Sequence, residues 1–335
     1  MRVVAAVDKF RGTATAGEVA AAIARGVVKA GGTCVEFPVA DGGEGTLDAL
    51  GGPNRTTTVS SPLGDPVEAG WRMRGRTAII EMARASGLGL VGGADGNDAM
   101  AATTYGTGEL ISAALDAGAK RIIVGLGGSA TTDGGLGAQR AVYPLHRLRG
   151  VELLVACDVR TTFCDAAEVF GPQKGASTAE VKLLRRRLER LAQVYREQFN
   201  VDVEHIEGSG AAGGLAGGLV AVGGQLVPGF ELIADELELA DAIDGVDLVI
   251  TGEGFLDAQS FEGKVVGGVA ELAQRARVPV IAIVGQADAD EVAGRIAYVS
   301  LVEKFGDDAA FTKTAACIAA AAADATRAFL SSSAG

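Results

Sequence analysis

The strongest constraint on the fold is an alternation of short β-branched runs with Ala- and Leu-rich amphipathic segments along most of the 335-residue chain. Short apolar runs are typical of parallel strands buried on both faces, and the segments between them are typical of connecting helices. The pattern predicts an α/β fold with mainly parallel sheets. We predict strands at Arg2–Val7, Cys34–Val39, Arg121–Leu126, Val151–Cys157, Val246–Thr251, Val278–Val284 and Ile296–Val302.

Two helix starts carry the spacing of a capping box, in which a hydroxyl residue precedes a Glu by three positions. Thr15 precedes Glu18, and Ser177 precedes Glu180 ahead of a long helical pattern that runs through Phe199. These pairs predict where two helices begin.

One segment interrupts the alternation. Residues 55–82 hold three short runs separated by the turn signals SPLGDP and RGR, which predicts a small antiparallel element. The α/β pattern then resumes, and the chain length exceeds the ~250 to 300 residues at which one core stops growing. We predict two α/β domains, one inserted in the other, with limits at 1–60 plus 235–335 for the first and 61–234 for the second.

The formal net charge of −12 argues against partners such as nucleic acid or anionic lipid. The Arg185–Arg187 triplet lies in a helical pattern and is interpreted as a solvated helix face. Four cysteines without CxxC spacing indicate reduced thiols, and no apolar stretch reaches ~18 residues, so we predict a cytoplasmic protein that neither spans nor binds membranes. Its oligomeric state is left open between monomer and homodimer.

Charged residues and glycines follow five of the predicted strands. In open parallel sheets, ligands bind at the carboxyl ends of the strands, so these residues are candidates for one site. Each loop taken alone would be a turn in which an Asp caps the next helix, but five together favour a ligand site. The residues are Asp8, Lys9 and Arg11, then Asp41 and Glu44, then Asp133, then Asp158 and Lys174, and finally Glu253, Asp257 and Lys264.

This combination suits phosphoryl transfer. The triphosphate of ATP needs backbone N–H donors from glycine-rich turns, carboxylates that hold Mg²⁺, and cationic side chains near the phosphoryl group that moves. The residues therefore predict a site that handles phosphate.

Competing motifs are weaker. G-x-G-x-x-[GA] matches begin at Gly125 and Gly208, but the first lacks the acidic residue ~20 positions on and the second follows a poor strand, so a dinucleotide site is disfavoured. Walker A, protein-kinase and G-x-S-x-G hydrolase motifs do not occur. His146 and His205 have no Cys or His neighbours and are interpreted as surface residues.

The loops as a set resemble the bacterial type I glycerate kinases through nearly the whole chain. The matching segments, in the order of that family, are DKFRGT, ADGGEGT, SPLGDPVEA, IIEMARASGL, TTYGTGELI, VGLGGSATTDGG, VACDV, VFGPQKGA, GSGAAGGLAGG, DLVITGEGFLD and GKVVGGVA. The resemblance implies two α/β domains facing across a cleft, and transfer of the ATP γ-phosphoryl group to D-glycerate, usually at the 2-hydroxyl, with Mg²⁺ as cofactor.

The resemblance also implies roles for individual residues. Those expected to be catalytic are Asp8, Asp41, Asp133 and Lys174, and those expected to bind substrate are Lys9, Arg11, Glu44, Asp158 and Lys264. Nucleotide or phosphate contacts are expected at Gly127, Gly128, Ser129, Gly213, Gly214, Gly252 and Gly254, and metal ligands at Glu253 and Asp257.

Two features depart from the family pattern. Arg11 stands where many members have Lys, and its guanidinium still offers a permanent cation. Between Gln139 and Val151 only RAVYPLHRLRG remains, where relatives usually have some tens of residues. This shortening bears on substrate scope and activity. The alternatives are therefore a kinase that forms 3-phosphoglycerate or acts on another hydroxy acid, and a non-catalytic metabolite-binding relative.

Overall fold

The computed structural model describes residues 1–10 and 12–333 and divides the chain into two compact units. Unit 1 comprises Met1–Asp41 and the chain from Phe230 onward, and unit 2 comprises Gly42–Gly229. Since β3 (Arg55–Ser60) pairs with β4 (Pro66–Arg74) inside unit 2, we propose domain limits at 41/42 and 229/230 instead of those expected from the sequence. No helix in the described ranges is both long and apolar enough to cross a membrane.

Unit 1 contains a five-stranded, all-parallel sheet in the order β13-β11-β9-β1-β2. Its strands are β1 (Arg2–Val7), β2 (Thr33–Pro38), β9 (Leu248–Gly252), β11 (Val280–Val284) and β13 (Ala297–Ser300), and a short parallel pair is formed by β10 (Phe255–Leu256) and β12 (Gln286–Ala287). Its helices are α1 (Ala16–Lys29), α9 (Gly229–Glu236), α10 (Leu239–Ile243), α11 (Val265–Ala276), α12 (Ala289–Val292), α13 (Leu301–Phe305), α14 (Asp307–Thr312) and α15 (Thr314–Ser333).

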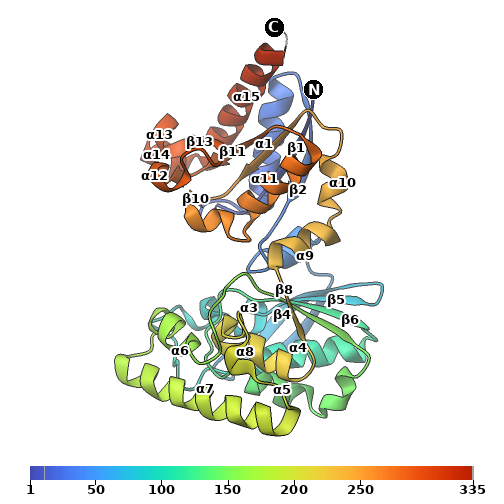
Figure 1. The fold of residues 1–335 in the computed structure, drawn as a ribbon, viewed down its shortest axis with the longest axis vertical. Helices are drawn as coiled ribbons and strands as arrows, with labels where there is room; N and C mark the ends of the chain where they lie inside the picture. Colours follow the sequence, from blue (N-terminus) through green and yellow to red (C-terminus); the bar gives the residue numbers. More distant parts are fainter. Residues whose placement is uncertain (11, 334–335) are drawn as a thin grey trace. The chain divides into compact units, whose positions relative to one another are not determined.

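Helices cover both faces of this sheet. On one face, α1 and α15 lie side by side and pack against β1 and β9 (Figure 1). The contact is close because Gly26 has no side chain: a Cβ atom there would come within 2.2 Å of the Ala319 carbonyl oxygen. On the other face, Val266 of α11 packs against Ala282 and Val284 of β11. Burial on both faces explains why the strands read as continuous apolar runs.

Unit 2 contains a six-stranded sheet in the order β3-β4-β5-β6-β7-β8, antiparallel from β3 to β5 and parallel from β5 to β8. The remaining strands are β5 (Thr77–Glu81), β6 (Arg121–Gly125), β7 (Glu152–Ala156) and β8 (Gln225–Val227). The helices are α2 (Thr46–Ala49), α3 (Ala83–Ser86), α4 (Tyr105–Asp116), α5 (Leu136–Val142), α6 (Ala166–Phe170), α7 (Thr178–Phe199) and α8 (Ala211–Ala221).

The sequence-based predictions of fold class and helix starts are confirmed. The Thr15 hydroxyl accepts a hydrogen bond from the Glu18 amide at 3.2 Å, and the Ser177 hydroxyl accepts one from Glu180 at 3.4 Å, so both capping boxes form. The antiparallel element near 55–82 is part of the larger sheet, because β5 also pairs with β6. The last predicted strand was too long: Ser300 caps α13, so the chain turns helical at Leu301.

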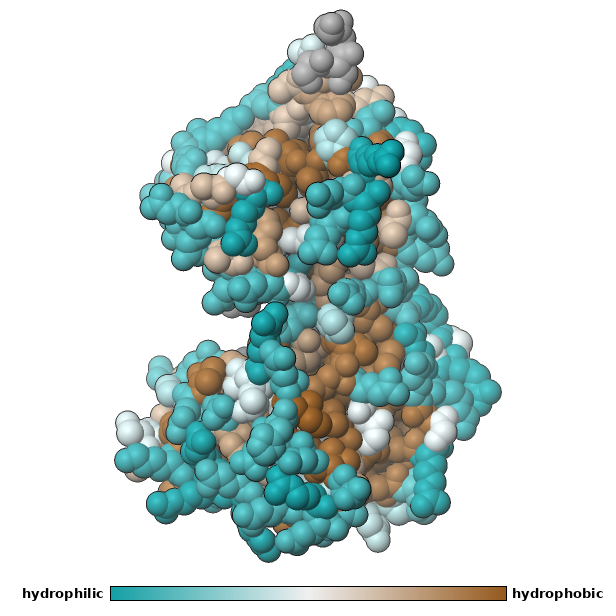
Figure 2. Space-filling view, in the orientation of Figure 1, coloured by the Kyte–Doolittle hydropathy of each residue, from teal (hydrophilic) through white to brown (hydrophobic). Residues whose placement is uncertain are grey.

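Helix α7 is amphipathic and forms an outer edge of unit 2. Leu184, Leu188 and Tyr195 are buried against α6 and the neighbouring loops. The predicted solvated face is confirmed, because Arg186 and Arg187 are exposed, and the surface over the helix is mostly hydrophilic (Figure 2).

Candidate active site

The unit 1 sheet has a topological switch point between β1 and β9. From β1, the chain adds β2 on one side and then β9, β11 and β13 on the other. Open parallel sheets bind ligands outside the carboxyl ends of their strands at such a point. Asp8 and Glu253 follow the two strands that flank it, and Asp41 follows β2. The sheet order therefore brings together carboxylates that are far apart in the sequence.

A pocket of about 400 Å³ lies at this edge of unit 1. It gathers seven of the residues expected from the sequence: Asp8, Lys9, Asp41, Glu253, Gly254, Asp257 and Lys264. The rest of its lining comes from Phe10, Thr13, Phe255, Gly285, Gln286, Val302, Ala310 and Phe311. Arg11, also expected here, lies outside the described residues.

The backbone fixes the first loop of the pocket. The Asp8 amide donates to the Gly252 carbonyl at 3.0 Å, which continues the β1–β9 pairing beyond the strand. The Asp8 carboxylate accepts a hydrogen bond from the Lys9 amide at 2.7 Å and lies 3.8 Å from the Lys9 ammonium group. A negative and a positive side chain are thus held together at the switch point.

The loop after β9 supplies the opposite wall. Asp257 accepts hydrogen bonds from the Ser260 amide at 3.0 Å and from its hydroxyl at 3.2 Å, which fixes the short turn that follows. Lys264 is the residue before α11 and also lines the pocket, so a cationic side chain and a helix N-terminus come from the same point of the chain. A helix N-terminus attracts anions through its unpaired N–H groups and its dipole.

Glu253 is a buried carboxyl group of the pocket with a strongly shifted pKa. Its Oε1 atom is buried without a hydrogen-bond partner among the described residues. Burial raises the pKa of Glu253 to about 7; the charges of Asp8 and Asp257 add to this, while a Ser260 hydrogen bond and the Lys264 charge oppose it. A buried carboxylate oxygen without a donor is suited to accept a cation or a substrate hydroxyl.

Gly252, expected to contact phosphate, instead allows two strands to pack. It is buried in β9, and a Cβ atom there would come within 2.0 Å of the Ile283 carbonyl oxygen in β11.

In unit 2, a second set of expected residues lies at the ends of β6 and β7. A Cβ atom at Gly127 would come within 2.9 Å of the Glu44 backbone nitrogen, so these two loops touch. Gly128 has a φ of +61° and is exposed, and Ser129 is nearly buried. After β7, Asp158 accepts a hydrogen bond from the Gly229 amide at 2.7 Å.

Glu81 holds the Glu44 loop and was missed in the sequence. This buried carboxylate accepts hydrogen bonds from the Gly45 and Leu47 amides at 3.3 and 3.2 Å, and burial raises its pKa. Glu81 lies inside the apolar run IIEM, and apart from its charge nothing in the sequence indicated that it holds a loop.

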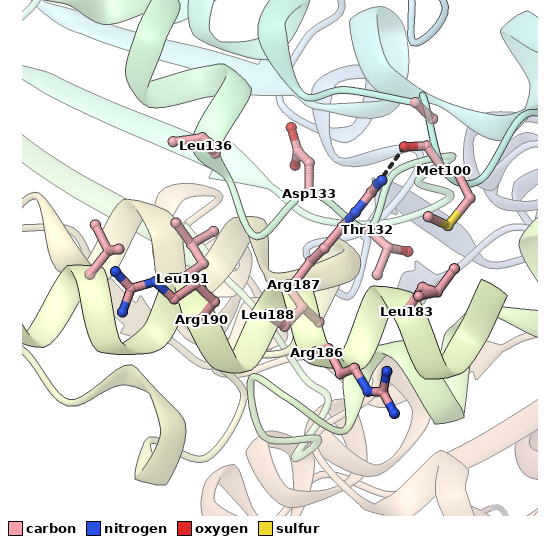
Figure 3. Close-up of a pocket in the computed structure, with 12 residues that line it drawn as sticks. Met100, Thr132, Asp133, Leu136, Leu183, Arg186, Arg187, Leu188, Arg190 and Leu191 are labelled. Atoms are coloured by element: carbon pink, nitrogen blue, oxygen red, sulfur yellow. Dashed lines mark hydrogen bonds between the residues drawn. The ribbon is translucent and has the colours of Figure 1, made fainter. Parts of the chain in front are cut away.

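Asp133, expected to be catalytic, accepts several hydrogen bonds from its own surroundings in unit 2. Its carboxylate accepts hydrogen bonds from the amides of Thr104, Gly135 and Gly137, at 2.8, 3.1 and 3.2 Å, and from the hydroxyls of Thr103 and Thr104. These bonds fix the start of α5 against the start of α4. Asp133 also borders an apolar cavity of about 560 Å³ against α7, where Arg187 reaches across to the Met100 carbonyl oxygen (Figure 3).

Replacing Asp133 with Asn is expected to destabilise unit 2 by about 2 to 3 kcal/mol, because the amide nitrogen cannot accept and leaves at least one buried N–H without its charged partner. Urea unfolding would measure the loss, with the exposed Asp65→Asn as a control expected to change stability by less than about 0.5 kcal/mol. Unchanged stability together with lost turnover would restore the catalytic assignment.

Lys174, also expected to be catalytic, is only 2% exposed. Its ammonium group donates to the Thr131 carbonyl oxygen at 2.7 Å and lies over the Phe170 ring. Burial lowers the pKa of Lys174 to about 7, opposed by the charge of Asp133. This position argues against direct contact with a phosphoryl group.

The Gly213–Gly214 pair packs against the protein's own backbone. Ala212, Gly213 and Gly214 all have positive φ, and a Cβ atom at Gly213 would come within 1.9 Å of the Thr131 carbonyl oxygen. The close approach that these glycines allow is to the loop that carries Asp133, not to the surface.

The most compact group of potential metal ligands in the described ranges is Asp202, Glu204 and His205. Arg196 already pairs with both carboxylates, and His205 contacts Asp202 at 3.0 Å. The group is a surface ion-pair network at the end of α7.

Comparisons with known proteins agree with this fold and these motifs. The sequence profile of the glycerate kinase family matches residues 3–143 and 144–330. The chain is 39% identical to glycerate 2-kinase of Escherichia coli (strain K12) over 93% of this chain and 90% of the relative. It is 41% identical to glycerate kinase of Haemophilus influenzae over 85% and 86%. The chain belongs to the glycerate kinase family.

The same assignment holds in three dimensions. The crystal structure of a Salmonella typhimurium LT2 protein assigned as glycerate kinase 2 superimposes with a TM-score of 0.83 at 34% identity, covering 99% of each chain. The resemblance inferred from the motifs is confirmed, and so is the enzyme class: glycerate kinases are phosphotransferases.

The comparisons also bear on the shortened segment between Gln139 and Val151. The profile match breaks between Tyr143 and Pro144. The Escherichia coli match spans 352 aligned positions, but 93% of this chain is only about 312 residues. About 40 aligned positions therefore have no residue in this chain. In the structure, Arg147 anchors the short connection to α4 by bonds to Ser112 and Asp116, both at 2.6 Å.

Proposed function

We propose that this chain transfers the γ-phosphoryl group of ATP to the 2-hydroxyl of D-glycerate, with Mg²⁺ as the metal. The observation that carries the proposal is the unit 1 pocket, where carboxylates and ammonium groups from the loops after β1, β2 and β9 meet at the switch point of the sheet. Family membership supports ATP as the donor and glycerate as the acceptor.

The donor set of this pocket fits Mg²⁺. Carboxylate oxygens are the protein ligands that Mg²⁺ prefers, and Asp8, Asp41, Glu253 and Asp257 supply them. The buried Oε1 atom of Glu253, which has no hydrogen-bond partner in residues 1–10 and 12–333, suits a cation. When bound, the metal would neutralise negative charge on the phosphates.

The protein's own cations would act on the same charge. Lys264 at the N-terminus of α11 and Lys9 beside Asp8 can hold the phosphates, since this chemistry depends mostly on positioning and electrostatics. We assign Asp8 or Asp41 the role of orienting the attacking hydroxyl. Glu44 and Asp158 in unit 2, together with Arg11, remain proposed substrate-binding residues, and Gly127, Gly128 and Ser129 remain proposed phosphate contacts.

The direct test is an ADP-release assay with Mg-ATP and D-glycerate, followed by ³¹P NMR of the product. We expect ADP and 2-phosphoglycerate in equal amounts. A signal from 3-phosphoglycerate would change the regiochemistry but keep the kinase. Calorimetric binding of D-glycerate with no ADP release would instead support the non-catalytic alternative.

A further inference from the structure

Both exposed phenylalanines of the chain line the unit 1 pocket. Of the eleven phenylalanines, only Phe255, 49% exposed, and Phe311, 58% exposed, are exposed to solvent. Neither packs on another aromatic ring in the described ranges. Phenyl rings are normally buried, and exposed ones that share a pocket point to a ligand surface.

The sheet order places all the charged pocket residues toward one end of the pocket. The charged residues follow β2, β1 and β9, whereas Gln286, Val302 and Phe311 follow β11 and β13. Neighbouring strands are ~4.8 Å apart, so β1 and β13 lie about 14 Å apart across the sheet edge. The end of the pocket beside β11 and β13, called here the apolar side, therefore carries no charged lining residue, and Phe255 borders it through its pairing with Gln286.

Backbone hydrogen bonds hold Phe255 on the apolar side. The Gly285 amide donates to the Glu253 carbonyl at 3.1 Å, and the Gln286 amide donates to the Gly254 carbonyl at 3.1 Å. These bonds pair Phe255 with Gln286 at the end of β11. The Val302 amide then donates to the Gly285 carbonyl at 3.0 Å and ties α13, the helix before α14, to the same point. The apolar side is thus linked by backbone to the charged residue Glu253.

The pocket has room for a ligand much longer than glycerate. A volume of about 400 Å³ is in the range of sites for drug-sized ligands, far more than a three-carbon acid fills. Lys9 and Lys264, together with a metal ion that the carboxylates would hold, suit a negatively charged end of a ligand, and the apolar side suits a planar, weakly polar group. A nucleoside triphosphate has this chemistry, because every nucleobase offers a flat face on which an aromatic side chain can stack.

We propose that Phe255 and Phe311 hold the purine base of ATP in the unit 1 pocket, with the triphosphate extending toward Lys264 and Lys9. This inference rests on the proposed function only for the identity of the nucleotide as ATP. It assigns recognition of the base to two phenylalanines, which were not among the nucleotide contacts expected from the glycine-rich motifs.

The test compares Phe255→Ala, Phe311→Ala and Phe311→Tyr in steady-state kinetics, with KM measured separately for ATP and for D-glycerate. Each alanine variant is expected to raise KM for ATP about tenfold, which corresponds to about 1.4 kcal/mol. KM for D-glycerate should stay within about twofold, and Phe311→Tyr should restore the affinity for ATP because it keeps the ring. Val28→Ala, an exposed apolar position of unit 1 outside the pocket, is the matched control.

A binding measurement separates this inference from the proposed function. The triphosphate of 2-aminopurine riboside, whose fluorescence falls on stacking, is titrated into the protein with Mg²⁺ and without glycerate. Quenching by the wild type that is lost in the alanine variants supports the inference even if no ADP is released from ATP and glycerate. Turnover with unchanged KM for ATP in both alanine variants, or a rise in KM for glycerate alone, overturns it.

Discussion

Lys264→Met is expected to lower kcat/KM about 10²- to 10³-fold, the loss typical of removing one group that stabilises transition-state charge in a preorganised site. The Lys264 side chain lines the unit 1 pocket with Glu253 and Asp257 and precedes the first turn of α11. Methionine keeps most of the length and apolar stem of lysine but none of its charge. The loss should therefore come from electrostatics, and coupled ADP-release kinetics would measure it.

The matched control is Lys29→Met, which removes an exposed ammonium group at the end of α1, outside the pocket. We expect it to keep wild-type kinetics, and both variants should keep the wild-type melting temperature within a few degrees. If Lys264→Met retained full turnover, phosphate binding would have to be reassigned to Lys9 or to unit 2.

The unit 1 pocket could be anticipated from the sequence because it follows a topological rule. Asp8, Asp41 and Glu253 each follow a strand that the β-branched pattern identifies, and a parallel sheet necessarily brings such ends to one edge. Sequence patterns specify which residues follow a strand. They do not specify how far each side chain is then buried.

That limit explains why two expected catalytic residues lie in surroundings that the sequence did not indicate. Asp133 and Lys174 lie in glycine-rich loops like those of Asp8 and Lys264. In the structure, however, backbone amides donate to the Asp133 carboxylate, and Lys174 is buried. Their surroundings depend on long-range contacts with no local sequence signal, because Thr104 before α4 donates to Asp133 and Lys174 reaches the loop that follows β6. Phe311 was missed for the opposite reason, because a lone aromatic in a helical segment is usually a core residue.

The enclosure of Lys174 predicts a pH-dependent contribution to stability. Below pH 7 its amine is protonated in both the folded and the unfolded chain, so the cost of burying the charge is fully present and constant. Between pH 7 and its ordinary pKa near 10.4, the unfolded chain holds a proton that the folded chain has lost. By linkage, this group's contribution to the free energy of unfolding then rises with pH, by about 2 kcal/mol between pH 7 and pH 9.

Lys174→Met removes this titration. We therefore expect the stability of the wild type relative to Lys174→Met, measured by urea unfolding, to increase by about 2 kcal/mol between pH 7 and pH 9. Lys182→Met, which replaces an exposed lysine of α7, should follow the wild type at both pH values. A difference independent of pH would show that Lys174 stays charged inside unit 2. Its charge would then be balanced by Asp133, and an electrostatic role for this pair near the predicted phosphate loop would again have to be considered.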